Sequence, residues 1–113
     1  MITDSQKTVV LECVIYHCER ILEILNERRI SLLSNIKSDK DIDPYNTISK
    51  TIQTINDLRT EFTSQMPWLN DKSVCSEQIE GGYRKIEPFL KRLYDKLSEN
   101  NLKSYVVSTL KAV

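Results

Sequence analysis

The chain is poor in glycine and proline and has no long apolar run. Its 113 residues include two glycines and three prolines, which is few for an all-β protein, because such a fold needs a turn about every 8 to 12 residues. No run of about 18 apolar residues is present, so we expect no membrane span. The start, MITDSQKTVV, lacks a basic segment followed by an apolar block, so we expect no secretion signal.

Cysteine is also scarce, and the net charge is zero. Cys13, Cys18 and Cys75 form an odd set without a C-x-x-C pair, which disfavours a disulfide scaffold and predicts a reducing, intracellular compartment, either cytoplasm or nucleus. With 16 Lys/Arg and 16 Asp/Glu, the chain as a whole has no bias toward nucleic acid or anionic membranes. The sequence therefore favours a soluble globular protein without an obvious polyanionic partner.

What the chain does have is apolar residues at alternating spacings of three and four. Over residues 5–37 the pattern is that of a heptad seam, with Ile15, Leu22 and Ile36 widening it on one side. The seam positions are Leu11, Val14, Cys18, Ile21, Leu25, Arg28 and Leu32. The stretch CERILEILNERRISLLSNI resembles the coiled-coil segments of many scaffold proteins, in its Leu/Ile spacing alone. A widened stripe predicts a long helix that faces two neighbours.

Three further segments show helical spacing, namely 44–66, 84–98 and 101–113. Asp43 and Pro44 suit a helix start, as cap and first turn. The less regular stretch 71–80 allows a short helix, which Asp71 or Ser73 would cap and the Gly81-Gly82 pair would end.

These segments predict an all-α fold with one domain spanning residues 1–113. The lengths of these segments favour an antiparallel bundle of three to four helices with heptad-like seams and a long first helix. We expect the second helix to return along the first, and the last two segments together to run along the first helix's whole length. The sequence has no internal repeat.

Chemistry-bearing residues do not assemble into a recognisable active site. Cys13 and His17 lie one turn apart, but an orienting carboxylate and an oxyanion hole are not identifiable. Cys13, Cys18, Cys75 and His17 would make a zinc-like set, yet close cysteine pairs are absent. The sequence therefore predicts no catalytic residue, no metal site and no cofactor, and a protein that is not an enzyme.

Three arginines interrupt the apolar seams. Arg28 takes a seam position in the first helix, Arg29 continues its flanking line, and Arg59 takes a rung of the second helix. Their stems can lie on the core while their heads reach water, or they can pair with carboxylates of this chain. Alternatively they face another chain that supplies the carboxylates, since polar residues at such positions can fix register and partner choice.

The C-terminal quarter is locally basic. Residues 84–113 hold 7 Lys/Arg and 3 Asp/Glu, whereas residues 1–83 hold 9 and 13. On a helical wheel one group of cations lies opposite the apolar face of the third strong segment; the group is Arg84, Lys85, Lys91, Arg92 and Lys96. This group is either an ordinary solvent face or a contact for an acidic protein, nucleic acid or an anionic membrane.

Two aromatic residues are further candidates for partner contacts. Trp68, the single tryptophan, either plugs the end of the bundle or serves as an exposed anchor, because Trp, Tyr and Arg dominate interface energetics. Tyr83 lies beside the basic group in sequence.

Together these features favour a non-enzymatic helical protein–protein interaction module. It would be a small scaffold subunit, or the N-terminal domain of one, in an intracellular multiprotein assembly. Its expected partner is another helical, acidic protein chain or a second copy of itself. The alternative is a module that binds nucleic acid or an anionic surface through the basic third helix.

Overall fold

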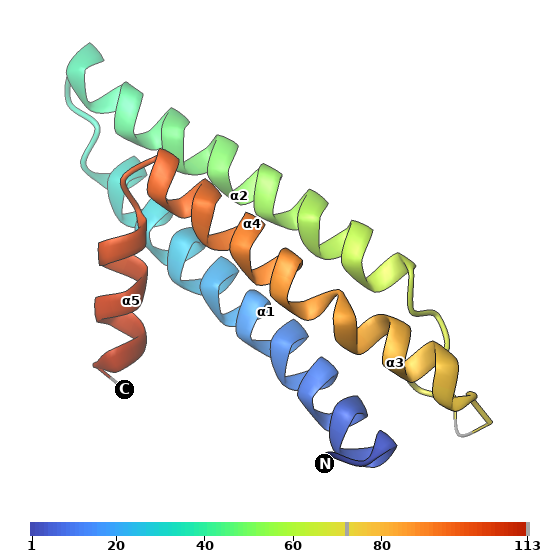
Figure 1. The fold of residues 1–113 in the computed structure, drawn as a ribbon. Helices are drawn as coiled ribbons and strands as arrows, with labels where there is room; N and C mark the ends of the chain where they lie inside the picture. Colours follow the sequence, from blue (N-terminus) through green and yellow to red (C-terminus); the bar gives the residue numbers. More distant parts are fainter. Residues whose placement is uncertain (72, 113) are drawn as a thin grey trace.

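The structure is a computed structural model that describes residues 1–71 and 73–112. Every regular secondary-structure element in this described part is a helix, and none is a strand. The α-helices are α1 (Asp4–Ser34), α2 (Ile42–Ser64), α3 (Ser76–Arg84), α4 (Ile86–Glu99) and α5 (Lys103–Lys111) (Figure 1). The predicted all-α bundle with a long first helix is therefore confirmed.

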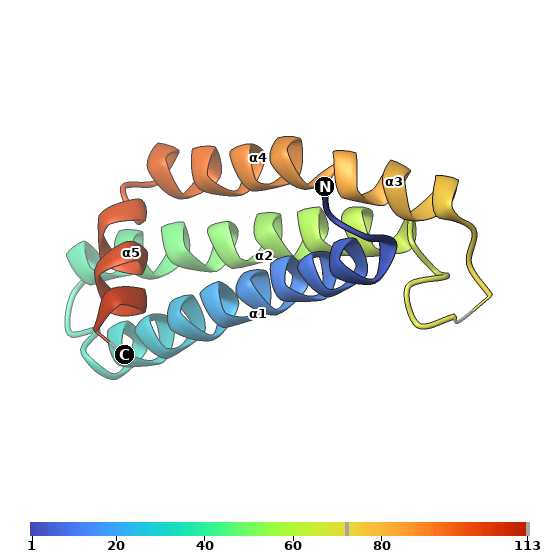
Figure 2. The same ribbon diagram turned by 60° about the horizontal axis from the view of Figure 1, so that its bottom comes forward.

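The helices form a rod of 55 × 26 × 21 Å. α2 returns antiparallel beside α1, and α3 and α4 follow each other in the direction of α1 (Figures 1 and 2). α5 does not continue along α1 as we expected. It turns back at the end of α4 and crosses from α4 to α1, so it closes one end of the bundle (Figure 2). No helix of the described residues combines the length and apolar character that crossing a membrane requires.

A local polar contact sets the start of α1, and the ends of both long helices differ by a few residues from the predicted ones. Thr3 caps α1, because its hydroxyl accepts the Gln6 N–H at 3.1 Å while the Gln6 side chain accepts the Thr3 N–H at 2.8 Å. α1 ends at Ser34, three residues before the predicted end. α2 begins at Ile42, two residues before Pro44, which does lie in its first turn; it ends at Ser64, where the sequence predicted Met66. Asp43 is thus not the cap.

The core contains the predicted seam of α1 from Leu11 to Leu25, together with Ile24, which the predicted seam did not include. The buried side chains of α1 and α2 are Leu11, Val14, Cys18, Ile21, Ile24, Leu25, Ile48, Thr51, Ile55, Leu58 and Phe62. The buried side chains of α4 and α5 are Phe89, Leu93, Leu97 and Val106. Phe62 and Phe89 stack with their ring centroids 4.2 Å apart. Burying one large apolar side chain, such as leucine or phenylalanine, stabilises the fold by about 1.5–3 kcal/mol.

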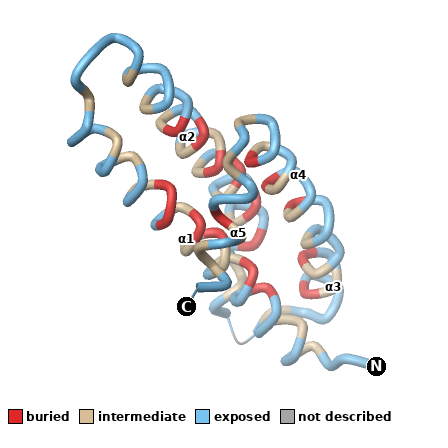
Figure 3. Tube along the Cα trace, turned by 90° about the vertical axis from the view of Figure 1, so that its left-hand side faces the viewer, coloured by how far each residue is buried: buried red, intermediate tan, exposed pale blue. Residues whose placement is uncertain are grey.

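The seam stops well before the turn that joins α1 to α2. All of residues 26–47 are described, and none of them is buried. Arg28 stands where the next buried rung would lie, and it is exposed. The end of the α1–α2 hairpin therefore projects beyond the core (Figure 3).

The short helix that the sequence predicted over residues 71–80 lies further along the chain, as α3 at Ser76–Arg84. Asp71 instead accepts the Ser73 N–H at 2.9 Å, and the helix begins after Cys75 and runs through both glycines to Arg84. Gly82 is there for packing, because a Cβ on it would lie 2.8 Å from Met66 Sδ and 3.1 Å from the Trp68 ring. Packing across the chain, rather than helix termination, explains this glycine.

Two breaks shape the C-terminal third. Pro88 lacks an N–H and cannot bond to the Arg84 carbonyl, which separates α3 from α4 at Lys85. After α4, Asn101 adopts a left-handed conformation with φ 59°, and the Leu102 N–H donates to the Leu97 carbonyl at 2.8 Å. This is a Schellman-type helix end, and it reverses the chain into α5.

Candidate partner-binding surfaces

The two adjacent arginines of α1 lie on different sides of the helix. The Arg28 guanidinium carbon is 5.6 Å from the centroid of the Tyr105 ring, a cation–π contact that ties α5 to α1. Arg29 donates to the Asn26 side-chain oxygen at 2.6 Å. Arg28 therefore has a structural contact within this chain, and its role toward a partner stays a prediction.

Arg29 and Arg59 are brought together in one groove. This groove lies between α1 and α2, has a volume of about 500 Å³, and includes the half-buried Leu22 and Ile52 in its lining. The Arg59 guanidinium is 3.4 Å from the Glu19 carboxylate, so it is paired within the chain. Internal pairing accounts for Arg59 without a second protein, and the predicted partner contact is left to experiment.

The basic group on α3 and α4 is interleaved with carboxylates. Four of its cations form ion pairs: Arg84 with Glu80 at 2.9 Å, Lys91 with Asp95 at 2.9 Å, Arg92 with Glu61 at 3.4 Å and Lys96 with Glu99 at 3.2 Å. Within residues 1–71 and 73–112, Lys85 takes part in no ion pair. Exposed pairs of this kind contribute about 0–1 kcal/mol each. The neighbouring carboxylates nevertheless reduce the local positive potential of this surface.

Trp68 and Tyr83 are both half-buried. The Trp68 ring lies against Gly82 and packs on the hydrophobic core of the bundle. Tyr83 has the Lys7 ammonium 5.7 Å from its ring centroid. Both aromatic side chains therefore help to hold α3 in place, and their predicted role as partner contacts stays untested.

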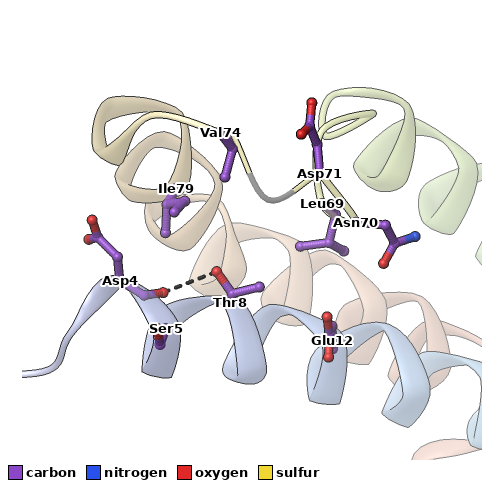
Figure 4. Close-up of a pocket in the computed structure, with 9 residues that line it drawn as sticks. All are labelled: Asp4, Ser5, Thr8, Glu12, Leu69, Asn70, Asp71, Val74 and Ile79. Carbon is purple, nitrogen blue, oxygen red and sulfur yellow. Dashed lines mark hydrogen bonds between the residues drawn. The ribbon is translucent and has the colours of Figure 1, made fainter.

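An open cleft lies between the start of α1 and the segment that leads into α3 (Figure 4). Its volume is about 560 Å³, with Asp4, Glu12 and Asp71 among the polar residues and Leu69 and Ile79 among the apolar ones. Two hydrogen bonds from Ser73, through its N–H and its hydroxyl, lower the pKa of Asp71. The sequence did not predict this cleft because it joins segments about 65 residues apart. Acidic residues alone define no ligand, so we assign no activity to it.

The absence of an active site stays a prediction. The surroundings of His17 and Cys18, the residues considered for catalysis or metal binding, are as follows. His17 Nε2 lies 2.6 Å from the Tyr94 hydroxyl, and burial lowers the pKa of His17. Burial raises the pKa of the Cys18 thiol to about 11, which keeps it protonated near neutral pH. Among the described residues, no group of three or more His, Cys, Asp or Glu side chains is placed to hold a metal ion.

The surface that the sequence did not single out is a second row of residues on α1. It also follows spacings of four and three, but it lies on the side of the helix opposite the buried seam. We call this row the outer face; it consists of Val9, Cys13, Tyr16, Arg20, Glu23, Glu27, Ile30 and Ser34. All of these are exposed except Arg20, which is half-buried.

The outer face carries large apolar side chains toward its two ends. Tyr16 is 70 % exposed, Val9 is 56 % and Ile30 is 55 %. The middle is charged, and there Arg20 donates to Glu23 at 3.2 Å. The spacing alone could have revealed this row, but the stronger buried seam fits the same helix and conceals it.

Comparisons with known proteins give no further guide. The chain matches no protein-family model, no curated protein and no solved structure.

Proposed function

We propose that this protein is a non-enzymatic helical interaction module whose partner packs along the outer face of α1. The observation that carries this proposal is the row of exposed Val9, Tyr16 and Ile30 at heptad spacing on a 31-residue helix. A helix that already buries one heptad seam has no structural need for a second one. Covering the second seam with another helix would bury these apolar side chains and stabilise a complex.

The shape of the molecule supports this proposal. α1 forms the lower edge of the rod in Figure 2, with α2 and α4 on its inner side. Tyr16 is more exposed than Val9 and Ile30. Tyrosine is also among the residues that contribute most to binding at interfaces. The outer face is therefore accessible to a helix that approaches lengthwise.

The setting we propose is an intracellular multiprotein assembly, with this chain as a small subunit or as the N-terminal domain of one. All three cysteines are described, and each is a free thiol. Cys13 and Cys75 are exposed, and exposed free thiols are typical of a reducing compartment.

A second candidate is binding to nucleic acid or another anionic surface through the basic group of α3 and α4. The observation that favours it is the high exposure of Arg84 and Lys91, whose side chains are 77 % and 76 % exposed. Their partners Glu80 and Asp95 lie on the same surface and oppose an approaching phosphate. Binding that is lost between about 50 and 200 mM salt would support this candidate.

The proposal is tested by capture from native extract with an outer-face variant. Tyr16→Glu with Ile30→Glu places two charges on the apolar ends of the face. We expect bound proteins that the wild-type chain retains at moderate salt to be lost from this variant, while its circular dichroism melting changes little because both side chains are exposed.

The matched control is Thr60→Glu with Ser104→Glu, which adds the same charges at exposed positions on α2 and α5. This control should retain the captured proteins. If the outer-face variant and the control capture the same set, the outer face is not the binding surface and the proposal fails.

A further inference from the structure

The charged middle of the outer face restricts what can pack on it. Between the apolar ends stand Arg20, Glu23 and Glu27, one cation followed by two carboxylates. A helical partner needs side chains that complement this order. We propose that one such partner is a second copy of this chain, with the two α1 helices packed antiparallel; this inference rests on the proposed role of the outer face.

The heptad spacing fixes the register. In an antiparallel pair of helices each a position packs beside a d position of the other helix, and full overlap centres the twofold axis between residues 21 and 22. The layers from the ends to the centre are then Val9 with Ser34, Cys13 with Ile30, Tyr16 with Glu27, and Arg20 with Glu23. Each layer occurs twice, because the axis exchanges the two copies.

Charge complementarity favours this register. The two central layers set Arg20 of each copy against Glu23 of the other, so opposite charges meet twice. In the next layer the Tyr16 hydroxyl can donate to the Glu27 carboxylate of the second copy, a charge-assisted hydrogen bond. The apolar Cys13 and Ile30 then pack together toward either end.

A parallel pair is disfavoured by the same residues. In register, it would place Arg20 against Arg20, Glu23 against Glu23 and Glu27 against Glu27. Like charges at facing positions repel each other and select against a pairing. The outer face is thus complementary to itself in the antiparallel orientation and not in the parallel one.

The rest of the fold leaves room for this arrangement. The outer face from Val9 to Ser34 is about 38 Å long at about 1.5 Å per residue. α5 contacts α1 through Tyr105 and Arg28, and Arg28 is not part of the outer face. A single helix pair makes a small interface, so the dissociation constant should be on the order of 10–100 µM.

The first experiment measures mass against concentration by sedimentation equilibrium on the full chain. We expect a shift from 13.2 kDa toward twice that mass as the concentration passes through the range of the dissociation constant. Arg20→Glu and Glu23→Arg, each alone, should weaken association at least tenfold. An equal mixture of the two variants should associate again, because opposite charges then meet between the copies.

The control for these variants is Lys91→Glu. It makes the same kind of charge change and breaks an exposed ion pair with Asp95 on α4, away from the outer face. Association should be unchanged. Equal weakening by Lys91→Glu and Arg20→Glu would assign the effect to net charge and overturn the inference.

The second experiment tests the orientation by disulfide cross-linking. In a Cys75→Ser background, Ile30→Cys should give a disulfide between positions 13 and 30 of opposite copies, identified by peptide mass after mild oxidation. Without Ile30→Cys, the two Cys13 side chains of the antiparallel pair lie about 26 Å apart and should not cross-link. A disulfide that joins Cys13 to Cys13 instead would show a parallel pair and overturn the inference.

The outcomes separate this inference from the proposed function. A chain that stays at 13.2 kDa up to about millimolar concentration and forms no 13–30 disulfide overturns the second copy as partner. If that monomer still retains a different protein, and the retention depends on Tyr16 and Ile30, the proposed function as an interaction module is supported. If neither a second copy nor another protein depends on the outer face, both proposals fail.

Discussion

Two neighbouring glycines in α3 have opposite environments. A Cβ on Gly81 would meet nothing within 4 Å, whereas one on Gly82 would lie 2.8 Å from Met66 Sδ and about 3.1 Å from the Trp68 ring. Both stand inside a helix, where alanine is intrinsically favoured over glycine by about 0.5–1 kcal/mol. Their different surroundings therefore decide the sign of the same substitution.

We predict that Gly81→Ala raises the free energy of unfolding by about 0.5–1 kcal/mol, because the helix gains propensity at no steric cost. Gly82→Ala should lower it by about 1 kcal/mol, since overpacking against Met66 and Trp68 exceeds the gain in propensity. Urea denaturation of the two variants measures this difference. Equal stabilisation by both would mean that the Trp68 ring moves aside freely.

The contact between His17 and Tyr94 predicts a pH-dependent stability. Because burial lowers the pKa of His17 in the folded state, the unfolded chain takes up a proton first as the pH falls below about 6.5. Stability should therefore decrease as the pH falls from about 7.5 to 5.5. The Tyr94 hydroxyl can donate to the neutral imidazole at 2.6 Å but not to its protonated form.

His17→Gln is the variant that tests this contribution, because an amide oxygen can accept the Tyr94 hydroxyl and does not titrate. Its melting temperature should vary less than that of the wild type over the same pH range. The carboxyls with a lowered pKa, Glu80 and Asp71, lose their contribution only below about pH 4.5 and do not interfere. Parallel pH profiles for wild type and variant would contradict the prediction.

At the scale of the helices, the turn between α4 and α5 depends on one residue. Asn101 has a positive φ of 59°, which asparagine tolerates and β-branched residues avoid. We predict that Asn101→Val lowers the free energy of unfolding by about 1–2 kcal/mol, while Asn101→Gly leaves it nearly unchanged. Urea midpoints measure both. If Asn101→Val had no effect, the helix end would not control the reversal of the chain.

The helices differ in how far the sequence could predict them. The seam from Leu11 to Leu25 was predictable, because its period reports directly which side of a helix is buried. The reversal at Asn101 was not, since an asparagine can also sit in an ordinary loop and its left-handed φ leaves no trace in the spacing. The role of Gly82 depends on Trp68, which packs on it from another segment, and a local pattern contains no such information.

The candidate surfaces, too, could be predicted from the sequence only in part. The basic residues of α4 were predictable as one group, because helical geometry alone places them together. Their pairing was only partly predictable: Lys91 meets Asp95 one turn away, but Arg92 reaches Glu61 on α2. The spacing of the outer face was recognisable in principle, yet no pattern in the chain indicates that α1 stands at the edge of the bundle with that side uncovered.

At the scale of the whole molecule, the two ends of the rod are unequal. None of residues 26–47 is buried, although α1 and α2 both extend into this end. We predict that amide hydrogens of residues 29–34 exchange with solvent at least about tenfold faster than those of residues 14–25, because local opening there exposes little apolar surface. Hydrogen exchange with peptide-level mass analysis measures this. Uniform protection along α1 would contradict it.

The placement of Trp68 gives this molecule a built-in optical reporter. The indole is the single one in the chain and rests on Gly82 at the α3 end, so its fluorescence emission reports that end alone. If α3 detaches while the remaining helices persist, the emission should shift to longer wavelength before the ellipticity at 222 nm declines. The two signals together would then distinguish fraying of one end from loss of the whole fold.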